Sequence, residues 1–413
     1  MEQLGQIIID GLKNMQKIKK VKARLTQCNR WISQVKSHNL FYWYRGIEDP
    51  SGREVDVNGR KMIMMGSYDY LGLSQDPEVK KAVSEAALKY GSSTGGPRLL
   101  SGTMQLHEEL ESAIAEFKGT EAAVSFNSGY LTNLTAVSTL FSKGDLIILD
   151  KFDHTSIYDG AKLSGAETKI FWHNNIEALE EILETSDSYN NVLLVLDAVY
   201  SAIGDLAPLP KMVELAKKYN AILYLDEAHC IGVIGEKGKG IDSHFGMNTK
   251  EVDIWMGTCS KAMASIGGYI AGNEELVNFL KFFANGIVFS GSPPATVTAA
   301  IIAALDIMKK DDSRLNKLWK NIEQYKSGLN NMGYDTMGTE SAIVPILIKN
   351  ESTAIRMAQY LDKEGIFTCP FIYPAVPRNT ARFRTCMTAN HTSEQINRVL
   401  DVFEKAGKKF GLL

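Results

Sequence analysis

The sequence predicts an α/β protein with a mostly parallel central sheet, α-helices on both faces and a smaller C-terminal α+β domain. Between residues 120 and 272, short apolar runs alternate four or five times with segments of helical character. This alternation is typical of parallel strands joined by right-handed helical crossovers. From Ser341 onward, short strands and helices follow one another in a mixed order, which indicates a separate domain.

The bulk composition is that of an ordinary globular protein. The 413 residues, 45% hydrophobic and 23% charged, are enough for one major and one minor domain. We expect an N-terminal basic helix with a short β segment over 1–75, a large α/β domain over 76–310 and the C-terminal domain over 311–413. The net charge of −3 gives no case for nucleic-acid binding.

The five cysteines show neither metal-ligand spacing nor a disulfide framework. This usage favours a reducing cytoplasm and predicts no bound metal. No signal peptide is visible, and no apolar run is long enough to span a bilayer.

The first forty residues differ in charge from the rest, with eight lysines and arginines against Glu2 and Asp10. Apolar residues recur at helical spacing from Leu4 to Leu25, which predicts one basic amphipathic helix. Such a helix can pack on its own protein or on a partner subunit, or it can lie on an anionic membrane surface. We favour packing, because many surface helices have this pattern.

The next elements carry clear local signals. Residues 53–57 and 61–65 flank Asn58-Gly59, which predicts a β-hairpin. Asp76 and Pro77 are suited to the N-cap and first position of a helix that runs to Tyr90. The following glycine-rich loop, 91–103, contains Arg98, which we include among the candidate substrate-binding residues.

A first candidate ligand site lies where the predicted strand 122–126 turns into a helix. Ser128, Gly129 and Tyr130 occupy that turn. Small residues at a helix N-terminus present backbone N–H groups that bind phosphate well. Taken alone, the pattern is equally compatible with a tight turn that binds nothing.

Polar residues also follow the later strands. His154 comes after the strand 146–149, and Ser201 after the strand 192–196. The buried run 222–225 ends abruptly in Asp226, with His229 close behind. Charged groups at the carboxyl ends of parallel strands lie where open α/β sheets keep their ligand sites.

The next predicted strand, 252–256, leads to Lys261, which is flanked by small hydroxyl residues. Pyridoxal phosphate (PLP) enzymes hold their cofactor as a Schiff base on a lysine and place a carboxylate at the pyridinium nitrogen. Lys261 and Asp226 fit these two roles. Thr258 and Ser260 fit the role of phosphate donors. A solvated lysine and a strand-end cap are the simpler interpretations of each residue alone, but the combination favours a PLP site.

These residues resemble the α-oxoamine synthase family, within the fold type I group of PLP enzymes, from about residue 42 to the end. The motifs that carry the resemblance are Tyr70-Leu71-Gly72-Leu73, Ser101-Gly102-Thr103, Ser128-Gly129-Tyr130, His154-Thr155-Ser156-Ile157, Asp226-Glu227-Ala228-His229, Gly257 to Lys261 and Thr388 to Thr392. Ser260 to Gly272 and Pro374 to Pro377 look most like the serine palmitoyltransferase branch.

The resemblance implies a role for each matching residue. Lys261 would also remove the Cα proton, and His154 would stack on the cofactor ring. His229 and Ser201 would lie near the ring hydroxyl, and Gly129, Tyr130, Thr258 and Ser260 would contact the phosphate. Arg384, or as second choice Arg382, would hold the substrate carboxylate. Asp69 stands where many relatives carry a substrate-side asparagine, and Gly291 replaces a threonine in a loop that often reaches a neighbouring subunit.

The implied reaction is the decarboxylating condensation of a small amino acid with an acyl thioester to a 2-amino ketone. L-Serine and a long-chain acyl group, carried by CoA or acyl carrier protein, are the preferred substrates, as in sphingolipid synthesis. Glycine, alanine or cysteate are the alternatives. A fold type I aminotransferase or carbon–sulfur lyase and a non-catalytic scaffold are the rival functions. We expect a homodimer in the cytoplasm. The alternative is a homodimer that touches the inner membrane surface through its N-terminal helix.

Overall fold

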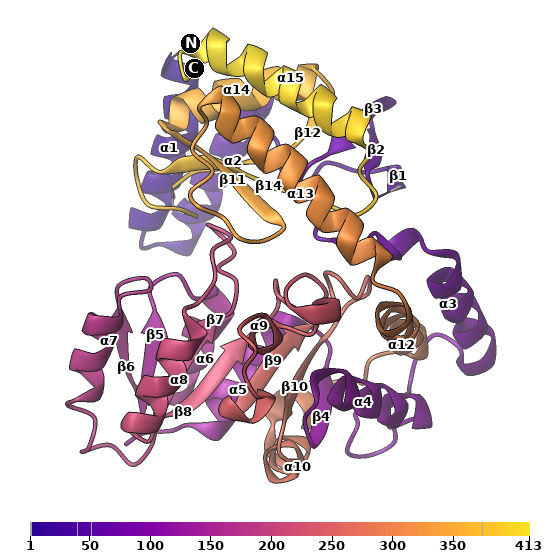
Figure 1. Ribbon diagram of the computed structural model, residues 1–413. Coiled ribbons are helices and arrows are strands. Elements are labelled where there is room, and N and C mark those ends of the chain that lie inside the picture. The colour runs from indigo at the N-terminus through magenta and orange to yellow at the C-terminus, as the bar shows by residue number, and fades with distance from the viewer. Residues whose placement is uncertain (1, 39, 51, 374) are drawn as a thin grey trace. The chain divides into compact units, whose positions relative to one another are not determined.

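A computed structural model describes residues 2–38, 40–50, 52–373 and 375–413 of the chain (Figure 1). Pro374, at the start of one motif of the resemblance, lies outside these residues. The chain forms two compact units, one of Met1–Ser67, Ala202–Gly204 and Trp319–Leu413, the other of Tyr68–Ser201 and Asp205–Leu318. This division differs from the three segments expected from the sequence, because the N-terminal and C-terminal segments belong to one unit.

The unit of residues 68–201 and 205–318 is built on a seven-stranded sheet of order β4-β10-β9-β8-β7-β5-β6. Its strands are β4 (Ala122–Phe126), β5 (Leu146–Asp150), β6 (Glu167–Phe171), β7 (Val192–Asp197), β8 (Ile222–Asp226), β9 (Ile254–Thr258) and β10 (Gly268–Gly272). Only β10 runs antiparallel to both its neighbours. The predicted mostly parallel sheet is therefore confirmed.

Helices cover both faces of this sheet. The helices of this unit are α3 (Pro77–Tyr90), α4 (Gln105–Lys118), α5 (Gly129–Leu140), α6 (Thr155–Ser164), α7 (Ile176–Leu183), α8 (Leu209–Lys218), α9 (Ile241–His244), α10 (Glu274–Phe283), α11 (Asn285–Val288) and α12 (Ala295–Lys310), with 3-10 turns η1 (Leu73–Gln75), η2 (Glu236–Gly238) and η3 (Thr249–Glu251). The chain leaves β5 and β7 in opposite directions along the sheet. Right-handed crossovers then place α6 and α8 on opposite faces.

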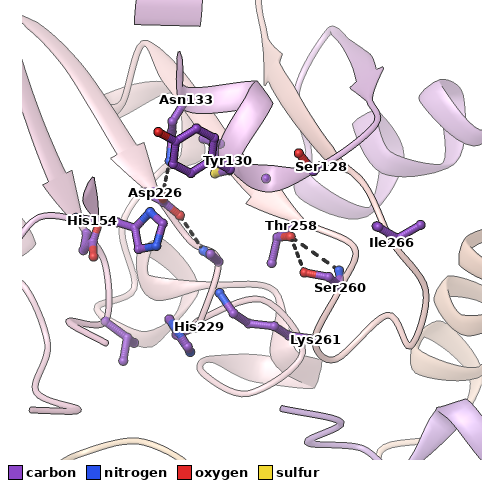
Figure 2. Close-up of a pocket in the computed structure, with 15 residues that line it drawn as sticks. Ser128, Tyr130, Asn133, His154, Asp226, His229, Thr258, Ser260, Lys261 and Ile266 are labelled. Atoms are coloured by element: carbon purple, nitrogen blue, oxygen red, sulfur yellow. Dashed lines mark hydrogen bonds between the residues drawn. The ribbon is translucent and has the colours of Figure 1, made fainter. Parts of the chain in front are cut away.

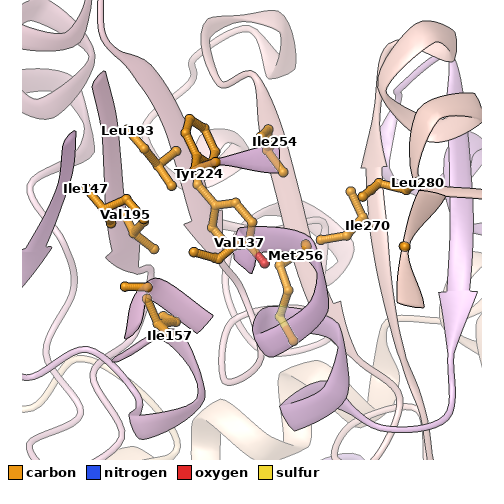
Figure 3. Packing of buried hydrophobic residues seen from close by; sticks show 14 of the residues in the cluster. Val137, Ile147, Ile157, Leu193, Val195, Tyr224, Ile254, Met256, Ile270 and Leu280 are labelled. Atoms are coloured by element: carbon orange, nitrogen blue, oxygen red, sulfur yellow. The ribbon is translucent and has the colours of Figure 1, made fainter. Parts of the chain in front are cut away.

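The core of this unit follows the strand period of two residues. Leu193 and Val195 point to the face covered by α5 and α6, where they pack with Ile147, Ile157 and other apolar residues (Figure 3). The residues between them, Leu194 and Leu196, are also completely buried. Burial of both faces explains why these strands read as continuous apolar runs in the sequence.

Local sequence signals set several element ends as predicted. The Asp76 side chain accepts a hydrogen bond from the Glu78 amide at 2.8 Å, and Pro77 begins α3. The strand before Lys261, however, is shifted by two residues from the predicted 252–256. Its pairing of Ile254 with Tyr224 and of Thr258 with Gly268 makes Thr258 the last strand residue.

The other unit contains two small sheets. One joins β1 (Asp49–Pro50), β2 (Glu54–Val57), β3 (Arg60–Met64) and β12 (Ile366–Phe367), and the second joins β11 (Ile343–Lys349), β13 (Pro370–Phe371) and β14 (Ala381–Cys386). Asn58 and Gly59 both have positive φ, as the turn of the predicted hairpin requires. The parallel pairing of β3 with β12 ties the N-terminal segment to the C-terminal one.

The helices of this unit are α1 (Glu2–Lys17), α2 (Val21–Ser37), α14 (Glu351–Lys363) and α15 (Ser393–Phe410), together with the C-terminal part of α13 (Ser313–Met332). The prediction of a single N-terminal helix is wrong, because α1 ends at Lys17 and a second helix, α2, begins at Val21. Ile8 and Ile9 are buried, and α1 packs on α2 and α14. The packing of α1 on its own protein, which we favoured, is therefore observed, while Val21 and Leu25 remain 72% and 60% exposed.

Within the described residues, no helix is both long enough and apolar enough to cross a membrane.

Candidate active site

The carboxyl ends of β4, β5, β7, β8 and β9 lie at one edge of the sheet and enclose a pocket of about 300 Å³ (Figure 2). Nine of the residues that the sequence singles out line it: Ser128, Gly129, Tyr130, His154, Asp226, His229, Thr258, Ser260 and Lys261. The structure thus brings together residues that are up to 133 positions apart, because each follows a strand of the same sheet.

Asp226, the last residue of β8, is buried and firmly oriented. Its two carboxylate oxygens accept hydrogen bonds from the Asn133 side-chain amide at 2.7 Å and from the Ala228 backbone N–H at 2.8 Å. Asn133 is fixed in turn by the Tyr224 hydroxyl, which donates to its amide oxygen at 2.7 Å. These two N–H donors fix the orientation of the carboxyl group at the edge of the pocket.

The sequence analysis did not identify Asn133. It lies four residues after Gly129, on the same side of α5, and so faces the pocket with the turn that precedes it. This spacing is the signal that could have found it once the α5 N-terminus was taken as a ligand site.

A second carboxyl group, Asp197, also lines the pocket and was not identified from the sequence. It is the register partner of Asp226 on the adjacent strand β7. Burial, followed by the negative charge of Asp226, raises the pKa of Asp197 well above its usual range. This shift favours the protonated form of Asp197, in which the two neighbouring carboxyl groups do not repel each other as two anions.

Both histidines of the pocket are neutral at pH 7. Burial lowers the pKa of His154, and its Nδ1 hydrogen bonds with the Ser156 hydroxyl at 2.7 Å. Burial and the nearby Lys261 lower the pKa of His229 still further, and its Nδ1 lies 2.7 Å from the Tyr70 hydroxyl. Neutral rings can hydrogen bond or stack on a ligand without adding positive charge beside Lys261.

Hydroxyl groups gather around the start of α5. Ser128 caps this helix by accepting from the Leu131 amide, and Thr258 Oγ1 lies 2.8 Å from the Ser260 hydroxyl. A Cβ atom at Gly129 would lie 2.9 Å from Thr258 Oγ1, so only glycine lets the helix start approach β9 this closely. Free N–H groups at a helix N-terminus, with hydroxyls beside them, suit a phosphate group.

Lys261 follows β9 by three residues, and its amine is directed into the space that it shares with His154 and His229 (Figure 2). The pocket therefore combines a lysine, an oriented carboxylate, two neutral imidazoles and a phosphate cradle. These are the groups with which proteins hold PLP. Val199, Met256 and Ile266 complete the lining with apolar surface.

The remaining predicted residues have other surroundings. Among the described residues, Ser201 is not part of the lining. Asp69 accepts from the Leu73 amide and, at 2.6 Å, from the Ser74 hydroxyl, so it caps the 3-10 turn η1. Arg98 pairs with Glu111 at 2.7 Å. Their assignment to cofactor or substrate stays a prediction.

Arg382 and Arg384 lie on β14, in the unit that holds the two termini. Arg382 donates to the carbonyl of Ala202 at 3.1 Å, and the Arg384 guanidinium lies 4.3 Å from the centre of the Phe371 ring. Burial lowers the pKa of both guanidinium groups. Their proposed contact with a substrate carboxylate also stays a prediction.

A buried ion cluster braces the chain beside Asp226. The Lys118 amine lies 2.8 Å from carboxylate oxygens of both Glu227 and Asp242 and 3.5 Å from the centre of the Trp255 ring. Burial raises the pKa of Glu227 to about 7 against the opposing effect of Lys118. The end of α4, the residue after β8 and the start of α9 meet at this cluster. Their contacts fix the backbone at the end of β8, where Asp226 lies.

A similar brace supports the end of β5. His173 bridges Asp150, at 3.0 Å from Nδ1, and Asp205, at 2.8 Å from Nε2. Burial alone would lower the pKa of His173, but its hydrogen bonds and ion pairs with both carboxylates raise it to about 9. His173 is therefore a cation in the folded protein. No cluster of the kind that holds a metal ion occurs among the described residues.

The fold and the pocket define a PLP-dependent transferase of fold type I. The family model of class I and II aminotransferases matches residues 60–403. Within that family, the chain belongs to the α-oxoamine synthases. It is 41% identical to 8-amino-7-oxononanoate synthase of Treponema denticola and 39% identical to serine palmitoyltransferase of Bacteriovorax stolpii. These matches span 92% of this chain and, respectively, 97% and 90% of the relatives.

A solved structure supports the same conclusion. Serine palmitoyltransferase from S. paucimobilis, with PLP bound together with myriocin, superimposes with a TM-score of 0.92 at 32% identity. The match covers 96% of this chain and all of that one. The fold, the family and the cofactor that the sequence predicts are confirmed.

The hydrogen bond from Asn133 to Asp226 gives a first prediction. Asn133→Ala removes a donor to a buried carboxylate, which is worth about 2 kcal/mol. We expect the affinity for PLP to fall roughly 30-fold, measured by fluorescence titration of the apoenzyme. Asn175→Ala is the matched control, because it removes only the cap of α7. Equal affinities of wild type and Asn133→Ala would contradict this role.

The raised pKa of His173 predicts a dependence of stability on pH. Because the folded value, about 9, lies above the ordinary value of 6.5, this histidine stabilises the fold fully below pH 6.5. The contribution is lost as the pH rises through 9. In thermal unfolding, His173→Gln should be less stable than wild type at pH 6, and the difference should shrink by pH 9.5. The exposed His244→Gln should show no such trend, and a constant difference for His173→Gln would refute the brace.

Proposed function

We propose that this protein joins a small amino acid to an acyl thioester and releases CO2, to give a 2-amino ketone and the free thiol of the carrier. The observation that carries the proposal is the shared pocket of Lys261, Asp226 and His154. Bound PLP supplies an electron sink that stabilises negative charge at the Cα atom of an amino acid.

The chain's own residues then have separate tasks. Asp226 holds the positive charge of the ring nitrogen, and Asn133 keeps that carboxylate in place. Lys261 binds the cofactor and, as a neutral amine, takes the proton from Cα. His154 would lie against the face of the ring. His229, held by Tyr70, and Ser201 would lie near the ring hydroxyl. Ser128, Gly129, Tyr130, Thr258 and Ser260 hold the phosphate.

Fixing the substrate carboxylate decides which Cα bond breaks. A guanidinium fork can hold a carboxylate in one plane by two hydrogen bonds. We assign this task to Arg384, with Arg382 as the second choice. Because the carboxylate leaves as CO2 after the new carbon–carbon bond has formed, the arginine has to release it within each cycle.

The relatives support two pairs of substrates. In 8-amino-7-oxononanoate, carbons 8 and 9 with the amine are alanine without its carboxylate, and carbons 1 to 7 are a seven-carbon dicarboxylic acyl group. This activity is named for the relative with 41% identity and outweighs the serine preference of the sequence analysis. Alanine with that acyl thioester is thus our first candidate pair. Serine with palmitoyl thioester is the second, since the superimposed structure is a serine palmitoyltransferase.

The test measures product by mass spectrometry. The holoenzyme is offered L-alanine, L-serine, glycine and L-cysteate, each with pimeloyl-CoA and with palmitoyl-CoA. We expect a 2-amino ketone and one CO2 per thiol released, fastest with L-alanine and pimeloyl-CoA. Faster turnover of L-serine with palmitoyl-CoA would establish the second pair. Lys261→Ala should make no product, because it lacks both the cofactor linkage and the base.

The same assay separates the rival functions. A fold type I aminotransferase would make a keto acid from the amino acid and would not need the thioester. A scaffold would purify without the visible colour of bound PLP. Either result would refute the proposed condensation.

We also propose that the protein is a homodimer of the cytoplasm. Phe279, Phe282, Phe283 and Phe289 are exposed on or directly after α10 and α11, and an exposed apolar cluster of this kind suits a protein partner. The five cysteines are free. A monomeric, fully active species in analytical ultracentrifugation would refute the dimer.

Peripheral membrane contact is proposed for one small region, the junction of α1 and α2. Val21 and Leu25 are exposed there beside Lys19, Lys20 and Lys22. Exposed apolar residues with a basic surround suit an anionic lipid surface.

The corresponding prediction uses the double variant Val21→Asp with Leu25→Asp. It should lose sedimentation with phosphatidylglycerol vesicles while it keeps its activity, because α1 still packs through Ile8 and Ile9. Ile170→Asp, which changes an exposed apolar residue on β6, serves as the control. Equal sedimentation of wild type and double variant would contradict membrane contact at this junction.

A further inference from the structure

A second cavity, of about 480 Å³, lies wholly within the unit that holds the two termini. The end of α2, the turn between β2 and β3, and the end of α14 form its walls. Four cationic side chains face one carboxylate in its lining: Lys36, Arg45, Arg60 and Lys363 against Asp362. The cavity thus has a strong excess of positive charge.

The single carboxylate is already engaged. Asp362 pairs with Arg45 through one oxygen and with Arg60 through the other, at 2.8 Å. Its side chain is only 21% exposed, and that of Arg45 only 13%. In such a partly dry environment charges interact more strongly than in water. Among the described lining residues, no further carboxylate faces Lys36 and Lys363.

The wall of the cavity is also short of hydrogen-bond acceptors. The Arg45 guanidinium lies 4.1 Å from the centre of the Phe367 ring. Its Nε and Nη2 groups, and the hydroxyl of the buried Tyr42, have no hydrogen-bond partner in the described part of the chain. Buried polar groups are nearly always satisfied in folded proteins. A cluster of unmatched donors behind a cationic surface indicates that an acceptor-rich anion completes it.

We propose that this cavity binds the phosphoryl group of a small phosphorylated ligand. A phosphate dianion offers enough charge and enough acceptor oxygens for two lysines and an arginine at once, which a single carboxylate does not. The volume exceeds that of one bare anion and lies in the range of small-molecule sites. Phe41 supplies an apolar wall for the rest of the ligand.

The same phosphoryl chemistry comes from two sources, a soluble phosphomonoester or the headgroup of an anionic lipid. The proposal does not rest on the proposed condensation, because no residue of the catalytic pocket takes part. It also differs from membrane contact at the α1–α2 junction, since Arg60 and Lys363 belong to β3 and α14.

The test uses the PLP-loaded enzyme, so that the phosphate cradle of the catalytic pocket is filled. Inorganic phosphate and adenosine 3′,5′-bisphosphate are titrated by calorimetry at low salt, and phosphatidylglycerol vesicles by sedimentation. Arg60→Gln and Lys363→Gln each remove one exposed cation of the cavity. Lys61→Gln is the matched control, because Lys61 is an exposed cation next to Arg60 on β3 and does not line the cavity.

We expect saturable binding of the bisphosphate, weakened about five-fold by each cavity variant, unchanged by Lys61→Gln and reduced by added salt. Binding of the vesicles alone, with the same pattern among the variants, would support the site and identify the lipid headgroup as the source. Absence of binding to all three probes would overturn the proposal. Equal weakening by Lys61→Gln would also overturn it, because it would show general attraction to a basic surface.

Discussion

The register of β7 with β8 is the constraint on which the catalytic pocket depends. It sets Asp197 and Asp226 side by side at the same level of the sheet. Two neighbouring buried carboxyl groups cannot both ionise at low cost. Their surroundings therefore have to favour a proton on one of them. Asn133 and the Ala228 amide donate to Asp226, while burial and the charge of Asp226 raise the pKa of Asp197. A one-residue slip of either strand would remove this arrangement, since it would turn one side chain to the other face.

Burial also affects the other titratable groups of the pocket. Burial lowers the pKa of both His154 and His229, which favours their neutral forms. Lys261 therefore has no cationic imidazole beside it. The apolar residues Val199, Met256 and Ile266 line the same pocket as Lys261. The backbone geometry of the sheet thus brings Lys261, Asp226 and both histidines into one pocket.

Much of the site could be predicted from the sequence, because its residues stand next to strands that the local sequence reveals. Lys261, Asp226 and His154 each follow an apolar run, and the carboxyl ends of parallel strands have to meet at one edge. Asn133 was harder to find, since a helical asparagine has no distinctive neighbours. The ion cluster of Lys118, Glu227 and Asp242 was equally hard to predict, because these residues come together only in the folded protein. The N-terminal break escaped prediction because the apolar period continues through Lys17–Val21, where the chain turns.

The ionic clusters around Lys118 and His173 use charge in the same way, each next to a residue that lines the pocket. Lys118 and His173 each stand between two carboxylates, and each joins a strand end to a distant loop. Such clusters are poor sources of stability, because desolvation offsets most of the attraction. They are, however, demanding in geometry, and removal of one member leaves an uncompensated charge. We therefore infer that they act through orientation. Glu227 follows Asp226 directly, and Asp150 ends the strand that leads to His154, so each brace fixes the backbone beside a residue that lines the pocket. An apolar replacement of equal volume would keep the fold and lose this alignment, which is how active sites come to retain ionic clusters that stability alone does not require.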